Sequence, residues 1–537
     1  MVDRFFDDAH EKVGRLLGEQ GYDGEAEKFQ IHMLDVRSRT FGEEHPDTIS
    51  AMSDLANTYE SLGKYADAEK LQIKVLELRN RYLGEENPDT IWAMSNLAVT
   101  YKSLGKYADA DTLEIKVLDL RKRYLGEEHP NTIIAMNNLA NTYKILGKYA
   151  IAEKLQIQVL DIRNRLLGEE HPFTISAMNN LAGTYASLGK YTNAEKLKSK
   201  VLDLRNRCLG EEHPDTISAM GNLANAYESL GKYADAEKLK IKVLHLRNRL
   251  DGKEHPNTIW AMGNLALTYE SLGKYEDAEK LQIQVLDLTN RLLGEEHPDT
   301  ITAMSDLSAT YNSLEKYAEA EELQIKVLHM RSKIFGEEHP DTITAMDNLA
   351  VTFMSLEKYA DAEKLQLKAL NLCNKLLGEE HPNTISTMGN LTATYIGLGK
   401  YADAQKLQIK VLDLRTRVLG AEHPDTISAM ENLAIIFSYL ERYTDAARLE
   451  VQVVGVRKKI LGEEHPKTVK AMALLAALRS QANTNPSGTE SNKKVSLIYS
   501  RVYLTHIVII LAHHLSKIAT KFSEIFKRKV FQYSNIS

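Results

Sequence analysis

The chain has 537 residues, of which 26% are charged, and a formal net charge of −7 at pH 7. That length suggests roughly three or four globular domains, and the acidic balance argues against nucleic acid as a partner, which would need a basic surface. Residues 1–8 are acidic rather than the start of a signal peptide, and Cys208 and Cys373 are the only cysteines. We therefore expect a reducing, cytoplasmic compartment.

A short junction, usually Gly-x-x-His-Pro, returns every 42 residues from Pro46 to Pro466 without insertion or deletion. This fixed period overrides the domain count, because repeats stack on their neighbours instead of closing separate cores. The expected parts are a degenerate first unit, ten full units, a terminal half-unit, a linker and a tail. Their bounds are residues 1–45, 46–465, 466–482, 483–494 and 495–537.

Each full unit predicts two helices, and the first unit, residues 46–87, shows why. Pro46 suits the first helical position, with His45 as a mediocre N-cap. Apolar residues at helical spacing carry this helix to about residue 61, and Gly63 ends it, because glycine enters a left-handed conformation without strain. A second amphipathic helix follows from Tyr65.

Three units depart from this turn, and the chain ends depart from the unit itself. Glutamate replaces the turn glycine at Glu315, Glu357 and Glu441, so those turns should be strained or reshaped. In the degenerate first unit, residues 25–39 predict one helix, the second of the pair. Helix pairs that cannot bury their apolar faces alone must stack, which predicts an all-α solenoid.

Several residues of the unit follow a known pattern: Leu55-Ala56, Tyr59, Gly63, Tyr65, Ala68 and Val75-Leu76. The pattern resembles the tetratricopeptide repeat, and the 42-residue period with its His-Pro junction is similar to the repeats of kinesin light chains. The resemblance covers about residues 5–482. It implies a right-handed superhelix whose first helices line a concave groove.

The sequence also differs from these relatives. Gln72, Gln156 and Gln408 stand where such helices usually have an aromatic, and no heptad coiled coil precedes the array. Similar arrays occur on fungal receptors with an upstream nucleotide-switch domain, but Gly63-Lys64 is followed by tyrosine, so no phosphate-binding loop is present. A sensor region acting with a separate ATPase is therefore the alternative to a scaffold.

One polar position recurs in all ten full units, and we call it the asparagine ladder. Its members are Asp54, Asn96, Asn138, Asn180, Asn222, Asn264, Asp306, Asn348, Asn390 and Asn432. The resemblance implies that these side chains clamp the backbone of an extended peptide. An amide offers donors and an acceptor, which suits any peptide bond. The alternative is that each asparagine only bonds the neighbouring helix.

Two tryptophans, Trp92 and Trp260, share another unit position. Tryptophan is a common anchor in interfaces, so both are candidate groove residues, although each could simply pack on the adjacent helix start. Specificity should come from variable positions three residues beyond the ladder, which turn more apolar from the middle of the array onward.

Catalysis, metal binding and cofactors are not expected. An active site needs unlike residues that converge, whereas the array repeats the same residues, and successive Glu-Glu-His copies should lie too far apart to share a zinc ion. The predicted function is a scaffold or adaptor that binds an extended peptide of a partner protein.

The tail differs in charge, with eight Lys and Arg against two Glu in residues 483–537, so it carries +6 and the rest −13. A heptad-like apolar stripe from Leu504 to Ile525 predicts an amphipathic helix. It could pack on the array, lie on a membrane surface with weak contact, span a membrane over residues 495–512, or be non-native sequence. Packing is favoured, because Met472, Leu475 and Leu478 should lack a covering helix.

Overall fold

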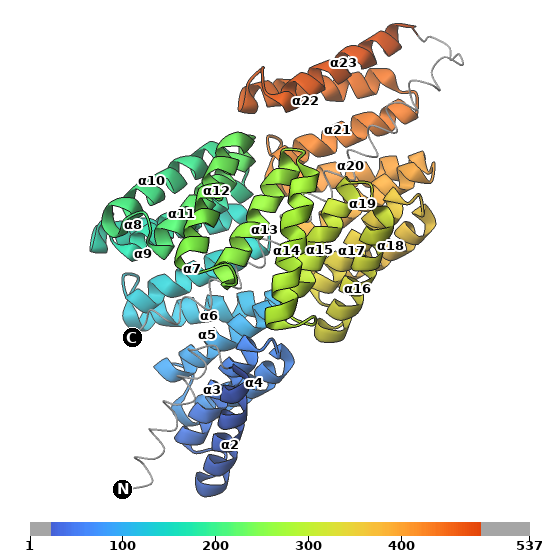
Figure 1. Cartoon of the computed structure of the whole chain (residues 1–537). Coiled ribbons are helices and arrows are strands. Elements are labelled where there is room, and N and C mark those ends of the chain that lie inside the picture. The colour runs from blue at the N-terminus through green and yellow to red at the C-terminus, as the bar shows by residue number, and fades with distance from the viewer. Residues whose placement is uncertain (1–22, 485–537) are drawn as a thin grey trace. The chain divides into compact units, whose positions relative to one another are not determined.

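The computed structural model describes residues 23–484, which form helices joined by short turns, with no strand among them (Figure 1). The described chain begins with α2 (Asp23–Phe41) and ends with α23 (Pro466–Thr484). The first helices of the pairs are α3 (Pro46–Ser61), α5 (Pro88–Ser103), α7 (Pro130–Ile145), α9 (Pro172–Ser187), α11 (Pro214–Ser229), α13 (Pro256–Ser271), α15 (Pro298–Ser313), α17 (Pro340–Ser355), α19 (Pro382–Gly397) and α21 (Pro424–Tyr439). The second helices are α4 (Tyr65–Leu83), α6 (Tyr107–Leu125), α8 (Tyr149–Leu167), α10 (Tyr191–Leu209), α12 (Tyr233–Leu250), α14 (Tyr275–Leu293), α16 (Tyr317–Phe335), α18 (Tyr359–Leu377), α20 (Tyr401–Leu419) and α22 (Tyr443–Leu461).

The chain divides between Ile145 and Leu146 into two compact units. Within the described residues, unit 1 holds α2 to α7 and unit 2 holds α8 to α23. Inside each unit, every helix packs against the helix before it and the helix after it in the sequence. The described residues form helices and no strands, and these helices pack in the order in which they follow along the chain. This confirms the prediction of an all-α solenoid.

The first helices share one N-cap. His45 Nδ1 accepts the backbone N–H of Asp47 at 3.2 Å, with Pro46 at the first helical position. Where asparagine replaces histidine, Asn87 Oδ1 accepts the N–H of Asp89 at 2.9 Å. Such a bond satisfies one of the amide groups that a helix start leaves unpaired. The histidine is therefore a working cap, and the prediction that it would cap poorly is wrong.

The turn inside each pair takes the left-handed conformation. Gly63 has φ 73°, and the Lys64 N–H bonds the Tyr59 carbonyl at 2.8 Å. The three replacing residues keep this conformation: Glu315, Glu357 and Glu441 have φ of 60°, 59° and 60°. The bond also survives, since the Lys316 N–H reaches the Tyr311 carbonyl at 2.9 Å. These turns are strained but not reshaped.

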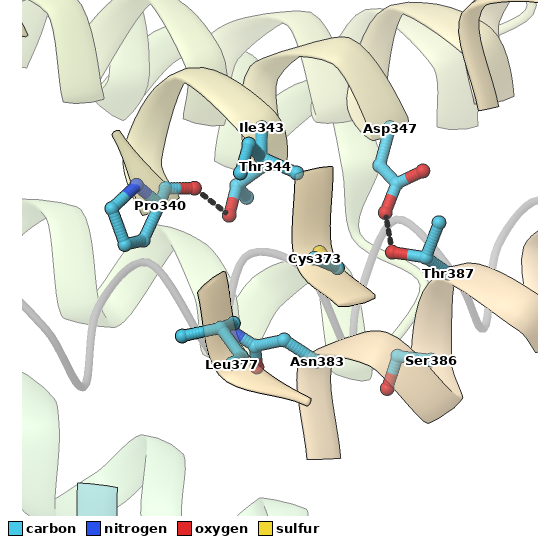
Figure 2. Close-up of a pocket in the computed structure, with 9 residues that line it drawn as sticks. All are labelled: Pro340, Ile343, Thr344, Asp347, Cys373, Leu377, Asn383, Ser386 and Thr387. Atoms are coloured by element: carbon cyan, nitrogen blue, oxygen red, sulfur yellow. Dashed lines mark hydrogen bonds between the residues drawn. The ribbon is translucent and has the colours of Figure 1, made fainter. Parts of the chain in front are cut away.

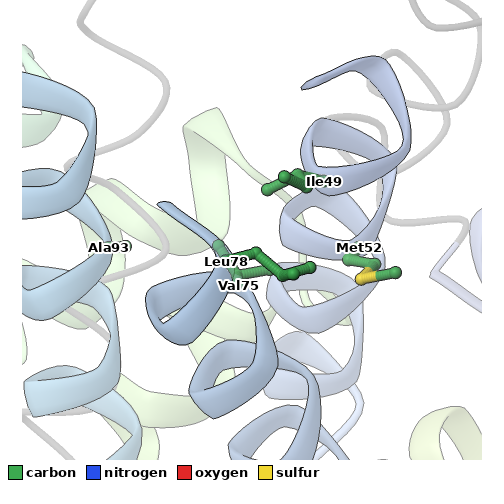
Figure 3. Packing of buried hydrophobic residues seen from close by; sticks show 5 residues of the cluster. All are labelled: Ile49, Met52, Val75, Leu78 and Ala93. Atoms are coloured by element: carbon green, nitrogen blue, oxygen red, sulfur yellow. The ribbon is translucent and has the colours of Figure 1, made fainter. Parts of the chain in front are cut away.

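The core is a series of small clusters, each shared by three successive helices. In Figure 3, Ile49 and Met52 on α3 face Val75 and Leu78 on α4, and Ala93 on α5 completes the set. The next cluster uses the corresponding residues 42 positions on: Ile91, Met94, Val117, Leu120 and Ala135. Each 42-residue repeat thus contributes residues of its first helix to the core of the preceding repeat. This shared packing couples the stability of neighbouring repeats.

The glutamines that replace the usual aromatic are buried inside this stack. Thr100 Oγ1 donates to Gln72 Oε1 at 2.6 Å, from the first helix of the next unit. Thr394 makes the same bond to Gln366 at 2.6 Å. The pairing is incomplete within the described residues, because Gln72 Nε2 and both polar side-chain atoms of Gln156 have no partner. Burial of these amides therefore keeps part of its desolvation cost.

The last helix of the described array, α23, differs from the prediction that its apolar residues lack a covering helix. Leu475 and Leu478 are buried against α21 and α22, in clusters that include Val453 and Leu433, and Met472 is half-buried beside them. The prediction that these side chains lack a cover is wrong, because the preceding pair covers them. Residues 485–537, which hold the predicted tail helix, lie outside the described part of the chain.

Within unit 2, segments far apart in the sequence touch. His423 Nε2 lies 3.3 Å from the carbonyl oxygen of Ser187, 236 residues away. A Cβ added to Gly189 would lie 2.7 Å from Cδ of Pro424. The equivalent close approaches join Gly147 to Pro382 and Gly231 to His465. These turns need glycine for space as well as for φ, because the helix starts of later pairs pack directly on them.

Candidate functional site

The asparagine ladder occupies one position in the middle of each first helix, from α3 to α21. Unit 1 carries Asp54, Asn96 and Asn138, and unit 2 carries Asn180, Asn222, Asn264, Asp306, Asn348, Asn390 and Asn432. Asn264 and Asn390 are buried, and the other members are half-buried. The half-buried members keep part of their surface open to a ligand.

The amides of the ladder differ in their partners. Asn264 Nδ2 donates to the carbonyl of Trp260 on its own helix at 2.9 Å. Asn348 Nδ2 donates to Ser305 Oγ on the first helix of the preceding unit at 3.3 Å. Among the described residues, Asn348 Oδ1 and Asn390 Nδ2 have no partner. Bonding to the neighbouring helix, the alternative function of the ladder, therefore occurs at Asn348 but leaves hydrogen-bonding capacity unused.

Asp306 stands in the ladder where most units have asparagine. Burial raises the pKa of its carboxyl to about 7, although the guanidinium of Arg331 works in the opposite direction. Near that pH the carboxyl carries a proton part of the time. A protonated carboxyl offers both a donor group and an acceptor group, as an amide does, so Asp306 can replace an asparagine chemically.

The two tryptophans lie on α5 and α13 and differ in exposure and in their neighbours. Trp92 is 39% exposed, and the guanidinium of Arg79 lies 5.4 Å from its ring centre. Trp260 is half-buried beside a hollow of about 10 Å³ that Lys240 and Asn264 also line. Its indole N–H has no partner among the described residues. Both rings pack against neighbouring helices and still present surface.

An arginine on the second helices makes a recurring contact that was not predicted from the sequence. Arg79 Nη1 donates to the backbone carbonyl of Asp89, ten residues later, at 3.0 Å. The same bond is made by Arg37, Arg121, Arg163, Arg205, Arg331, Arg415 and Arg457. It ties each of these second helices to the start of the following first helix, whereas Arg247 on α12 donates to the carbonyl of Pro214 at 2.9 Å instead. Two units lack the arginine and have Thr289 or Cys373 instead.

Where Cys373 replaces this arginine, a cavity of about 20 Å³ lies between α17, α18 and α19. Asp347, Cys373 and Thr387 at its floor are buried, whereas Thr344 and Asn383 at its rim are half-buried (Figure 2). The Thr387 hydroxyl donates to Asp347 Oδ2, and Asp347 Oδ1 has no partner among the described residues. Burial raises the pKa of Asp347 to about 7 and that of Cys373 to about 12. We call this cavity the Asp347 hollow.

Residues 23–484 contain neither a metal-binding cluster nor a membrane-spanning helix. In that range, no group of three or more His, Cys, Asp and Glu side chains could hold a metal ion. None of its helices combines the length and apolar character needed to cross a membrane. The segment considered as a possible span, residues 495–512, lies outside the described residues.

The chain is similar to known proteins in sequence and in structure. Residues 8–459 match the family model of the tetratricopeptide repeat in ten overlapping segments. No curated protein matches the chain. Similar solved structures include kinesin light chain nearly identical TPR-like repeats from Podosopora anserina, with 27% identity, 38% of this chain and 96% of that chain covered, and a TM-score of 0.34.

Two further structures resemble the chain at lower identity. BtubC (BKLC) from P. vanneervenii has 25% identity and a TM-score of 0.37, covering 42% of this chain and 93% of that one. A Rap protein complexed with competence and sporulation factor has 13% identity and a TM-score of 0.43, covering 77% of this chain and 98% of that one.

Proposed function

The chain belongs to the tetratricopeptide-repeat family, and we propose that it holds an extended peptide segment of a partner protein along its first helices. Membership of this family makes it a protein-interaction scaffold. The observation that supports the finer proposal is the asparagine ladder, which repeats one polar position through consecutive units and has eight of its ten members half-buried rather than buried.

The chemistry of the ladder suits a peptide backbone. Asparagine is a poor residue for the interior of a helix, so its return in the middle of eight first helices needs a reason. A side-chain amide can donate to a peptide carbonyl and accept from a peptide N–H, whatever the peptide sequence. We assign this role to the half-buried members, because the buried Asn264 and Asn390 would first have to turn outward.

The residues around the ladder would add selectivity. Trp92 is exposed enough to offer an aromatic face, and aromatic anchors contribute much of the energy of many interfaces. Three residues beyond the ladder, Val99, Leu267 and Ile435 are half-buried apolar side chains, whereas Asn57 and Asn141 are polar. A bound peptide would therefore meet different surfaces in different parts of the array.

The proposal is tested by selecting a binding peptide from a random library with the full chain and measuring its affinity for single variants. Asn180→Ala and Asn222→Ala, both half-buried, should each weaken binding by about 1 kcal/mol or more, because a hydrogen bond to the peptide is lost. The matched control is Asn390→Ala, which removes a buried member of the same ladder and should mainly lower the melting temperature.

Unchanged affinity in Asn180→Ala and Asn222→Ala, together with lowered melting temperatures, would show that the ladder is structural. The alternative, a sensor region that acts with a separate ATPase, would use the same surface. Identification of the natural partner distinguishes it, since a nucleotide-switch protein would support that alternative.

A further inference from the structure

In at least three pairs, the arginine of the second helix also donates to a side chain on the first helix of its own pair. The clearest case is in the last complete pair, where Arg457 Nη2 donates to Glu431 Oε2 on α21 at 2.6 Å. Arg457 Nη1 donates to Glu431 as well, and also to the carbonyl of Lys467 at 3.0 Å. In unit 1, Arg121 reaches Ser95 at 3.2 Å in the same register. A guanidinium thus fills the space between three helices.

In the pair α17 and α18, the acceptors of this contact are present and the arginine is not. Asp347 occupies the register position of Glu431, and Cys373 that of Arg457, each 84 residues earlier. The carbonyl of Asn383 corresponds to that of Lys467. The Asp347 hollow is therefore the place where the repeat normally puts a guanidinium.

The carboxyl in this hollow lacks the charge partner that the register supplies elsewhere. Asp347 is 4% exposed and accepts one bond from Thr387, and within residues 23–484 its Oδ1 has no partner. Among the described residues that line the hollow, no side chain is positively charged. A buried carboxylate is costly unless it is paired. The other unit without arginine avoids this cost, because Gly263 stands opposite Thr289.

The rim of the hollow occupies a register position that the proposed peptide-binding surface uses in other repeats. This rim includes Thr344 and Ser386, which are half-buried and stand at the register position of Trp92 and Trp260. Figure 2 shows Thr344 and Ser386 around the buried Cys373, with Asp347 and Thr387 beside it. A side chain that entered past this rim would reach the carboxyl.

We propose that the Asp347 hollow binds the guanidinium of an arginine side chain of the bound peptide, supplied from outside because Cys373 does not provide one. This inference rests on the proposed function. The planar guanidinium has five N–H donors in a fork, so it can serve the carboxylate of Asp347 and the carbonyl of Asn383 together. Lysine has no such fork, which makes arginine the preferred residue.

The test is methyl NMR of the full chain, following the Ile343 methyl that lines the hollow during titration with N-acetyl-arginine amide. The expected result is a saturable shift, reached at a concentration at least tenfold lower than with N-acetyl-citrulline amide, which has nearly the same shape without the charge. Asp347→Asn should abolish this difference. Cys373→Arg should block the probe, because it fills the hollow from within.

The matched control is Thr289→Arg, which adds an arginine at the same register position opposite Gly263 and should leave the Ile343 response unchanged. A shift that does not saturate, or that persists in Asp347→Asn, would overturn the proposal. The proposed function is tested separately. If Asn180→Ala and Asn222→Ala leave peptide affinity unchanged, the role of the asparagine ladder is refuted, but arginine binding in the Asp347 hollow is not. Selected peptides without arginine, with affinity unaffected by Asp347→Asn, would refute the hollow but not the ladder.

Discussion

Four carboxyl groups of unit 2 have raised pKa values, which couple its stability to pH. Burial raises the pKa of Asp306 and Asp347 to about 7, and that of Glu270 and Glu450 to about 8. Each group binds its proton more tightly in the folded chain than in the unfolded chain. The favourable contribution to folding is therefore complete below about pH 4 and is lost as the pH rises through 7 to 8.

Asp347→Asn tests this linkage at one residue. Because the pKa of Asp347 is about 7 when folded, against its usual 3.8, the ionised carboxyl destabilises the native chain fully above pH 7. The amide removes that cost, so the variant should be more stable at pH 8 by a few kcal/mol at most. The gain should shrink as the pH falls and disappear near pH 4. Thermal or chemical denaturation over this pH range measures it.

Asp287→Asn is the control for that measurement, because Asp287 is an exposed carboxyl in the middle of α14. It should change stability little at any of these pH values. A gain in Asp347→Asn that is equal at pH 4 and pH 8 would contradict the account, since it would not follow the ionisation of the carboxyl.

At the level of single residues, the sequence predicted which positions correspond but not the contacts that they make. The register of the asparagine ladder could be read from the sequence, because the 42-residue period fixes which residues correspond. Its hydrogen bonds and burial could not, because they depend on neighbouring units. The Asp347 hollow left a visible signal, the replacement of a recurring arginine by Cys373. Its meaning required the contact between Arg457 and Glu431.

At the scale of a helix pair, three of the turns contain a strained glutamate. Glu315 and Glu357 hold φ near 60° with the same backbone bond that the glycine turns make. Glu315→Gly and Glu357→Gly should therefore each stabilise the array by up to about 1 kcal/mol, because glycine adopts this conformation without a steric cost. The midpoint of chemical denaturation measures the change.

Gly273→Ala provides the reverse control. Gly273 has φ 73°, and a Cβ added there would meet no other atom within 4 Å, so conformational strain is the expected effect. The variant should lose about 1 kcal/mol. Destabilisation by Glu315→Gly would mean that contacts of the glutamate side chain outweigh the strain of its backbone.

The helices themselves were the most predictable elements. Proline at the first position, helical apolar spacing and glycine at the stop predicted the bounds of α3, because each signal acts locally. Two features depended on partners that the sequence does not display. The histidine caps require the geometry of Nδ1 in each junction, and the burial of Leu475 and Leu478 requires the preceding pair to supply the cover.

The whole molecule is a repetition of one contact surface in two compact units. Translation of the same residues from pair to pair gives a scaffold many equivalent hydrogen-bonding positions rather than one converged site. Departures from the repeat, such as Cys373 and the three turn glutamates, then give individual pairs their own properties. The central claim is that the ladder holds a peptide by its backbone.

The most direct measurement replaces single backbone amides of a library-selected peptide with esters and records the affinity of each analogue for the full chain. If the ladder binds the backbone, certain esters should lose about 1 kcal/mol. They should recur about every third residue, since neighbouring first helices lie ~8–10 Å apart and an extended peptide rises ~3.3 Å per residue. Equal affinity for every ester analogue and the parent peptide would contradict the claim.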